Sequence, residues 1–285
     1  MTEHAVLARD LVRQFGSRKA VGHLDLEVRT HEFLGLLGPN GAGKTTTIQV
    51  LSTLLAPTAG HVRVLGLDPI KEGSELRRRI GVVPQQIALY DEMSAAENLN
   101  FLGSVYGLRG KKLAERVDQA LEAAGLSDRR ESRVGEFSGG MKRRLNLVAA
   151  LLHGPELVFL DEPTAGVDPQ SRNHLFEMIE GLRGEVTLVY TTHLMGEVER
   201  LCDRIVVMDE GRLVAAGTLE ELHQAQLAQV QAGSTLQLEE GSDWERAAEL
   251  LRENGFAVRG SESKLDLEAI FLALTGKALR DGGKV

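Results

Sequence analysis

The sequence predicts an α/β fold built around a parallel sheet, and three observations support this prediction. Short β-rich runs alternate with helical patterns through most of the chain, as they do in βαβ units. The run Phe33–Leu37 is apolar at consecutive positions, which suits a strand buried on both faces. A glycine-rich loop and a helical pattern from Lys44 to Leu55 follow it directly. We therefore expect a parallel sheet with helices packed on it.

The remaining strands of this fold are predicted from the same alternation. Two opening strands, Ala5–Leu11 and Ala20–Val28, should be joined by a turn around Gly16 and Ser17. The segment Asp209–Gly211 is typical of a hairpin turn. Further strands are expected at His61–Leu67, Ile80–Pro84, Leu157–Leu160, Thr187–Thr192, Arg204–Met208 and Leu213–Ala216.

A mostly helical region interrupts the strand rhythm at about residues 87–152. Ser94 and Glu97 have the spacing of a capping box, and apolar residues follow at helical spacing. Lys111–Ala124 and Ser138–Leu152 are further helical patterns, each stopped near a glycine. We expect a helical subdomain here.

The pattern changes again beyond Gly217, which predicts a division into residues 1–217 and a small α+β appendage at residues 218–285. The appendage is open to two interpretations, a packing or dimer-stabilising unit and a regulatory one. Its expected elements are helices at Thr218–Gln226, Trp244–Asn254 and Leu267–Leu279, and strands at Thr235–Leu238 and Phe256–Arg259.

The composition indicates a soluble globular chain, with 42% hydrophobic and 26% charged residues. A net charge of −8 argues against a dedicated nucleic-acid binder, so no nucleic-acid partner is expected. Cys202 is the single cysteine, which excludes an intramolecular disulfide and suggests a buried structural thiol. Neither a leader peptide nor a run of about 20 apolar residues is recognisable. We expect a cytoplasmic protein that reaches a membrane only through a partner.

The glycine-rich loop matches the phosphate-binding pattern G-x-x-x-x-G-K-[ST] in a strand–loop–helix context. Glycines let the backbone curl so that several N–H groups converge on phosphate oxygens, and the helix adds its positive end. We expect Lys44 to reach the β- and γ-phosphates of ATP and the Thr45 hydroxyl to bind Mg²⁺. The predicted nucleotide-binding residues are Gly38, Pro39, Asn40, Gly41, Ala42, Gly43, Lys44, Thr45 and Thr46.

Two carboxylates follow the apolar strand Leu157–Leu160 at the edge where ligands bind in open α/β sheets. Asp161 is placed to hold Mg²⁺, and Glu162 is placed to polarise the attacking water as general base. Taken alone, the pair could be a solvated loop start. Downstream of a P-loop, the catalytic interpretation is favoured.

A second candidate phosphate-binding nest lies about 100 residues after the first. Ser138 is a natural N-cap, and Gly139 and Gly140 leave backbone N–H groups accessible. The alternative is an ordinary helix cap, but its place shortly before the Asp-Glu strand favours a functional role.

The order of these motifs resembles the nucleotide-binding domain of ATP-binding cassette (ABC) proteins over about residues 5–217. Gly38–Thr46 is similar to the Walker A motif and Leu157–Glu162 to the Walker B motif. Phe137–Met141 is similar to the LSGGQ signature, with Phe in place of Leu and Met in place of Gln. Ser138 and the two glycines, which would bind phosphate, are kept, so contact with ATP is still expected. The two departures limit the number of ABC subfamilies that the chain resembles.

Four further positions match the family by resemblance. Gln85 resembles the Q-loop glutamine, which joins the metal site to the helical subdomain, and His193 resembles the switch histidine that contacts the γ-phosphate. Asp168 resembles the D-loop aspartate and could also cap the helix that begins at Pro169. Phe15 resembles the aromatic residue that stacks on adenine. A strand-end histidine or a core phenylalanine is the structural alternative for His193 and Phe15.

The resemblance implies a P-loop NTPase (RecA-like) core with an antiparallel β subdomain and a helical subdomain. It also implies two cassettes paired head to tail, most simply as a homodimer, with each ATP between one Walker A loop and the partner's signature. One copy alone should then hydrolyse ATP slowly. ATP closes the pair and hydrolysis releases it, which is a ligand-driven population shift.

The segments Met141–Leu145 and Leu267–Gly276 resemble the daunorubicin-resistance branch of bacterial ABC-2 type exporters. There the integral membrane permease is a separate subunit, which implies export of a drug, lipid or other hydrophobic compound. An ABC importer subunit, a soluble ABC ATPase of translation or DNA maintenance, and a different P-loop enzyme such as a small-molecule kinase remain alternatives. A single P-loop, a single signature and no long heptad stretch weigh against the soluble ABC ATPase.

Overall fold

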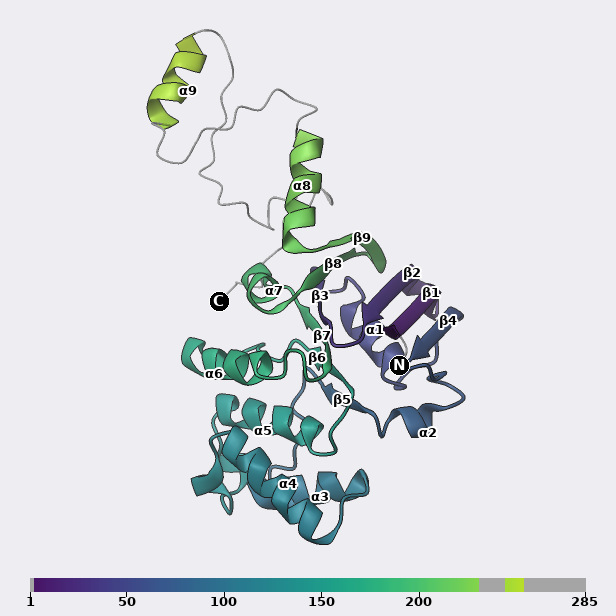
Figure 1. Cartoon of the computed structure of the whole chain (residues 1–285), viewed down its shortest axis with the longest axis vertical. Helices are drawn as coiled ribbons and strands as arrows, with labels where there is room; N and C mark the ends of the chain where they lie inside the picture. The colour runs from purple at the N-terminus through teal and green to yellow at the C-terminus, as the bar shows by residue number, and fades with distance from the viewer. Residues whose placement is uncertain (1–2, 231–243, 254–285) are drawn as a thin grey trace.

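A computed structural model describes residues 3–230 and 244–253 of the chain (Figure 1). Within these residues the strands form a six-stranded sheet of order β5-β6-β7-β3-β8-β9 and a three-stranded sheet of order β2-β1-β4. The predicted α/β fold class is confirmed. In chain order the strands are β1 His4–Phe15, β2 Arg18–Arg29, β3 Phe33–Leu37, β4 Ala59–Val64, β5 Ile80–Val83, β6 Leu157–Asp161, β7 Thr187–Thr192, β8 Arg204–Asp209 and β9 Arg212–Gly217.

The larger sheet is parallel except at one edge. β5, β6, β7, β3 and β8 pair in parallel, and β9 pairs antiparallel with β8. Every residue of β3, β6 and β7 is buried, because helices and the second sheet cover both faces. The β8–β9 hairpin turns at Glu210 and Gly211, both with positive φ, as the sequence predicted for Asp209–Gly211.

The smaller sheet is antiparallel, with β1 between β2 and β4. Its buried side chains, among them Val6, Leu24 and Val64, share one hydrophobic core with Ile48 and Leu51 of α1. This sheet therefore packs beside the glycine-rich loop and α1. Figure 1 shows β1, β2 and β4 next to α1, on one side of the parallel sheet.

Helices α3, α4 and α5 contact one another and lie together at one end of the molecule (Figure 1). They share a separate core that includes Leu99, Leu121 and Leu145. The capping box predicted at Ser94 is present, with Ser94 accepting from the Glu97 N–H and Glu97 accepting from Ser94 N–H. The helices are α1 Lys44–Leu51, α2 Gly73–Leu76, α3 Ala95–Val105, α4 Gly110–Ala123, α5 Gly139–Leu151, α6 Pro169–Glu180, α7 Met195–Leu201, α8 Leu219–Val230 and α9 Trp244–Glu253.

Several predicted boundaries are wrong: β1 ends at Phe15 instead of Leu11, and α8 ends at Val230 instead of Gln226. Two further errors come from residues with positive φ. α1 ends at Leu51 instead of Leu55, because Thr53 has a φ of 71° and cannot continue the helix. β4 ends at Val64 instead of Leu67, because Leu65 and Gly66 form a tight turn with φ of 50° and 79°.

Cys202 follows α7 and packs against β3. A Cβ on Gly35 would lie 2.8 Å from the Cys202 Sγ, so the two residues are in close contact. Burial raises the pKa of the Cys202 thiol well above its ordinary value, which keeps it protonated. This environment agrees with the interpretation of a structural thiol.

The appendage predicted at residues 218–285 is described only in part. α8 and α9 fall on two of its predicted helices. The strands at Thr235–Leu238 and Phe256–Arg259 and the helix at Leu267–Leu279 lie outside the described residues, and the division into two domains stays a prediction. In the described part of the chain, every helix is too short or too polar to span a membrane.

Candidate active site

The glycine-rich loop runs from the end of β3 to the start of α1, as predicted. Gly41 and Gly43 have φ of 86° and 98°, which glycine adopts without strain. A Cβ on Gly43 would lie 2.5 Å from the carbonyl oxygen of Ala20, so a larger residue would collide with β2. No side chain caps α1 at Gly43, and the N–H groups of its first turn have no partner within the helix. These donors suit an anionic ligand.

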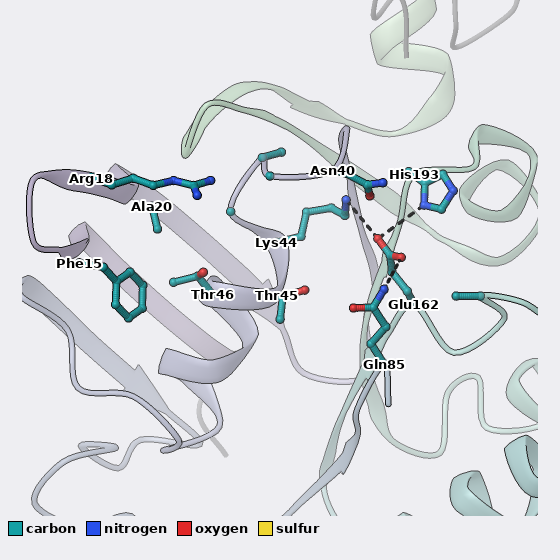
Figure 2. Close-up of a pocket in the computed structure, with 14 residues that line it drawn as sticks. Phe15, Arg18, Ala20, Asn40, Lys44, Thr45, Thr46, Gln85, Glu162 and His193 are labelled. Carbon is teal, nitrogen blue, oxygen red and sulfur yellow. Dashed lines mark hydrogen bonds and ion pairs between the residues drawn. The ribbon is translucent and has the colours of Figure 1, made fainter. Parts of the chain in front are cut away.

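A pocket of about 750 Å³ opens over this loop. Figure 2 shows Phe15 and Arg18 at one end of it and Gln85, Glu162 and His193 at the other, with the loop between them. The glycine-rich loop, the ends of the parallel strands and the turn between β1 and β2 therefore form one elongated cavity. Its lining is Phe15, Arg18, Ala20, Asn40, Gly41, Ala42, Gly43, Lys44, Thr45, Thr46, Gln85, Glu162, Ala165 and His193.

Lys44 is buried at the centre of the pocket, with its side chain 4% exposed. Its Nζ donates to the carbonyl oxygens of Gly38 and Pro39 at 2.7 and 3.2 Å and lies 3.4 Å from Glu162 Oε1. Burial lowers the pKa of Lys44, and the negative charge of Glu162 opposes this effect. The lysine is thus a buried cation close to the loop, where anionic oxygens would compensate its charge.

Glu162 is the meeting point of three other side chains (Figure 2). Its carboxylate lies within 3.4 Å of Lys44 Nζ and 3.5 Å of His193 Nδ1, and it accepts a bond from Gln85 Nε2 at 3.1 Å. Its own N–H donates to the carbonyl and the hydroxyl oxygen of Thr191. The positive φ of 45° is a costly conformation for glutamate, and such strain is typical of functional sites.

Asp161 is not part of the pocket lining and accepts hydrogen bonds from two hydroxyl groups. Thr45 Oγ1 donates to Asp161 Oδ1 at 3.1 Å, and Thr191 Oγ1 donates to the same oxygen at 2.7 Å. Burial raises the pKa of Asp161, and the two hydroxyl groups lower it again. A hydroxyl beside a buried, incompletely compensated carboxylate is an oxygen donor set that fits Mg²⁺.

The other end of the pocket carries the predicted Phe15 and two residues that the sequence did not indicate, Arg18 and Ala20. Phe15 is 44% exposed, so it is not a core residue, and Arg13 stacks 4.4 Å from its ring centroid. Arg18 was missed, although its guanidinium lies beside Gly41 and lines the pocket. An exposed arginine directly after the Gly16 turn is the signal that could have indicated it.

Comparisons with known proteins agree with this geometry. The family model described as "ABC transporter" matches residues 21–165, which include the glycine-rich loop and the Asp161–Glu162 strand end. The chain belongs to the ABC transporter family. It is an ATP-binding subunit of this family of ATPases, as the sequence predicted.

Three known proteins are similar in sequence to this ABC subunit over about three quarters of its length. The linearmycin resistance ATP-binding protein LnrL of Bacillus subtilis (strain 168) is 45% identical over 216 residues, 75% of this chain and 70% of that protein. The daunorubicin resistance ATP-binding protein DrrA3 of Streptomyces coeruleorubidus is 42% identical over 223 residues, 78% and 71% of the two chains. Nod factor export ATP-binding protein I of Cupriavidus metallidurans is 42% identical over 215 residues, 75% and 71% of the two chains.

Solved structures agree with the fold of the ABC subunit. An ATP-binding subunit of an ABC transporter superposes with a TM-score of 0.72 at 28% identity, covering 80% of this chain and 98% of that one. A dimeric ATP-binding cassette in a post-hydrolysis state bound to ADP and Pi superposes with a TM-score of 0.68, covering 75% and 98% of the two chains. At 24% identity this second likeness concerns the fold alone.

The structure places the signature residues of this ABC subunit outside the pocket. Ser138 caps α5 by accepting from the Met141 N–H at 3.2 Å, and Ser138 and Gly139 are exposed. Gly140 packs against α6, where an added Cβ would lie 2.2 Å from Ser171 Oγ. Asp168 caps α6 through the Ser171 N–H at 3.0 Å, which confirms its capping role. These residues are therefore not brought to the P-loop of their own chain.

Proposed function

We propose that this chain hydrolyses ATP with Mg²⁺ in a head-to-tail dimer and thereby powers a separate membrane permease. The observation that carries the proposal is the convergence of Lys44, Gln85 and His193 on the Glu162 carboxylate in the pocket above the loop. A carboxylate held by Lys44 and Gln85, with His193 beside it and a glycine-rich loop next to it, supports hydrolysis of a phosphoanhydride.

Each pocket residue has a distinct part in this proposal. The loop N–H groups and Lys44 bind the phosphates of ATP, and Phe15 stacks on the adenine. Glu162 accepts a proton from the attacking water, and Gln85 and His193 orient that water and the γ-phosphate. Lys44 now bonds the Gly38 and Pro39 carbonyls, so phosphate oxygens would compete for its Nζ.

Mg²⁺ fits the oxygen donors at the strand end. Thr45 and Asp161 would hold it, with Gln85 as a further predicted ligand. When bound, it neutralises charge on the phosphates and so supports their transfer to water. Among the residues described, no cluster of three or more His, Cys, Asp or Glu side chains is placed to hold a metal.

The position of the signature residues supports the proposed head-to-tail dimer. Ser138, Gly139, Gly140 and Asp168 are predicted to contact nucleotide, yet the pocket of their own chain lacks them. A second copy could supply them to complete the site. ATP binding would then hold two chains together, and hydrolysis would release them.

The transported compound is inferred from relatives. Their names specify linearmycin resistance, daunorubicin resistance and Nod factor export, so we propose export of a drug, lipid or other hydrophobic compound. The chain would act on the cytoplasmic face of the membrane, held there by its permease. A gene for a multi-span membrane protein next to the gene for this chain would favour transport over a soluble ABC ATPase.

The direct test of hydrolysis is Glu162→Gln in the full chain. Losing the base should lower kcat for ATP about 100-fold or more, while Mg²⁺–ATP binding is kept because Lys44 and Asp161 are unchanged. The Glu185→Gln variant removes an exposed carboxylate elsewhere and should retain wild-type turnover. A Glu162→Gln variant that turns over near the wild-type rate would contradict the proposal.

A further inference from the structure

A third buried carboxylate, after Asp161 and Glu162, lies close to the pocket without lining it. Glu197 is on α7 and is only 4% exposed. Three hydroxyl groups donate to it: Thr164 to Oε1 at 2.7 Å, Tyr190 to Oε2 at 2.9 Å and Thr192 to Oε2 at 2.6 Å. A buried carboxylate needs such donors, since it has lost its bonds to water.

The three hydroxyl groups come from the segments that carry the catalytic side chains. Thr164 is two residues after Glu162, and Thr192 directly precedes His193. Thr192 Oγ1 also accepts from the Leu194 N–H at 3.0 Å, so both neighbours of His193 belong to the same network. The network therefore connects the turn that bears the proposed base with the turn that bears the histidine.

Strand β7 extends this connection to the proposed metal site. Its last three residues, Tyr190, Thr191 and Thr192, all carry hydroxyl groups and alternate between the two faces of the sheet. Tyr190 and Thr192 bond Glu197, whereas Thr191 bonds Asp161 Oδ1. The end of β7 thus donates hydrogen bonds to the carboxylates of both Glu197 and Asp161.

We propose that Glu197 is a positioning residue for hydrolysis, which holds the His193 turn and the Glu162–Thr164 turn at a fixed separation. The inference rests on the proposed function, because Glu162 and His193 are its working parts. Glu197 contacts neither the pocket nor the loop that would bind phosphate, and so acts through its three hydroxyl partners.

The chemistry of the network favours a carboxylate over other side chains. All three partners are hydroxyl donors, and a carboxylate accepts from all of them without needing to donate. Burial, and next the charge of Glu197, raise the pKa of the Tyr190 phenol well above its ordinary value, so the phenol remains a donor. Glutamine keeps the shape but offers a single acceptor oxygen, so it should hold part of the network.

The test measures ATP turnover and ATP binding separately in the full chain. Glu197→Ala should lower kcat about ten-fold or more and leave the Kd of ATP within about two-fold, because the loop is untouched. Glu197→Gln should recover part of the lost kcat. Glu199→Gln on the same helix, an exposed position, is the matched control and should match wild type.

A double-mutant cycle with His193→Ala tests the route of the effect. If Glu197 acts through the His193 turn, the double variant should lose little more kcat than His193→Ala alone. Fully additive losses, equal losses in kcat and ATP affinity, or unchanged kcat in Glu197→Ala would each overturn the inference. Thermal unfolding of each variant identifies a Glu197→Ala chain that does not fold, in which case the soluble Glu197→Gln variant must show the kcat loss.

Failure of this inference is distinguishable from failure of the proposed function. Wild-type chain that hydrolyses ATP, with Glu162→Gln inactive and Glu197 variants normal, would contradict the inference alone. Wild-type chain without Glu162-dependent hydrolysis would contradict the proposed function.

Discussion

Lys44 and Glu162 form the closest pair of opposite charges in the pocket, and both are shielded from water. Their side chains are 4% and 9% exposed, and 3.4 Å separates Nζ from Oε1. A buried ion pair contributes little net stability once the loss of hydration is included. Its presence is better explained by function, since phosphate oxygens can replace one carboxylate as the partner of the lysine.

The residue-scale prediction concerns Lys44→Ala. Removing the buried cation should weaken ATP binding about ten-fold or more, because a charge-assisted bond to phosphate is lost. Isothermal titration of the purified chain with Mg²⁺–ATP measures the change. Lys112→Ala, at an exposed position of α4, is the control and should bind as wild type does. Unchanged affinity in Lys44→Ala would exclude the role assigned to this lysine.

At the scale of elements, α5 connects the signature to the loops that carry Gln85 and Ala165. Arg143 on this helix donates to the carbonyl oxygens of Gln85 and Ala165 at 2.6 and 3.0 Å. Both carbonyls belong to loops that line the pocket. The α5 N-terminus also packs directly on α6 through Gly140 and Ser171. A shift of α5 would therefore move the loops that carry Gln85 and Ala165.

The element-scale prediction compares two neighbouring glycines. Gly140→Ala should lower the free energy of unfolding by about 1–3 kcal/mol, because the new Cβ would lie 2.2 Å from Ser171 Oγ. Gly139→Ala meets no atom within 4 Å and should change stability by about 0.5 kcal/mol or less. Chemical denaturation followed by circular dichroism measures both. Equal stability of the two variants would contradict the close packing of α5 on α6.

At the scale of the whole molecule, each chain holds the two halves of a site apart. The loop and Glu162 line the pocket, while Ser138 and Gly139 lie exposed outside it. If two chains pair head to tail, each site takes its loop from one chain and its signature from the other. Under the proposed pairing, a complete site would need two chains.

The prediction at this scale is complementation between two defective chains. Lys44→Ala and Ser138→Ala chains should each hydrolyse ATP poorly, but their mixed dimer contains one site free of both substitutions. With random pairing, an equal mixture should regain about a quarter of the wild-type rate. Ser138→Ala alone should still bind ATP. Mixtures no faster than either chain alone would argue against shared sites.

Much of the fold could be predicted because its cues are local. β3 and β7 were predicted to the residue, since each is an apolar or β-branched run bounded by clear turns. The ends of α1 and β4 were not, because Thr53 and Leu65 adopt positive φ, which residues of these types seldom do. The sequence therefore does not predict a turn at threonine or leucine.

The sequence by itself determined the glycine-rich loop, the capping residues Ser138 and Asp168, and the acidic strand end. Each is a contiguous segment whose residues set their own backbone conformation and hydrogen-bond donors. Only the tertiary structure decided that Arg18 lines the pocket and that Glu197 joins the turn after Glu162 to the turn before His193. The physical reason is the packing of elements that are distant in sequence. β7 lies beside β6 in the parallel sheet, which brings Thr192 and Thr164 to Glu197. β2 belongs to the other sheet and packs against the glycine-rich loop at Ala20, which brings Arg18 to the pocket.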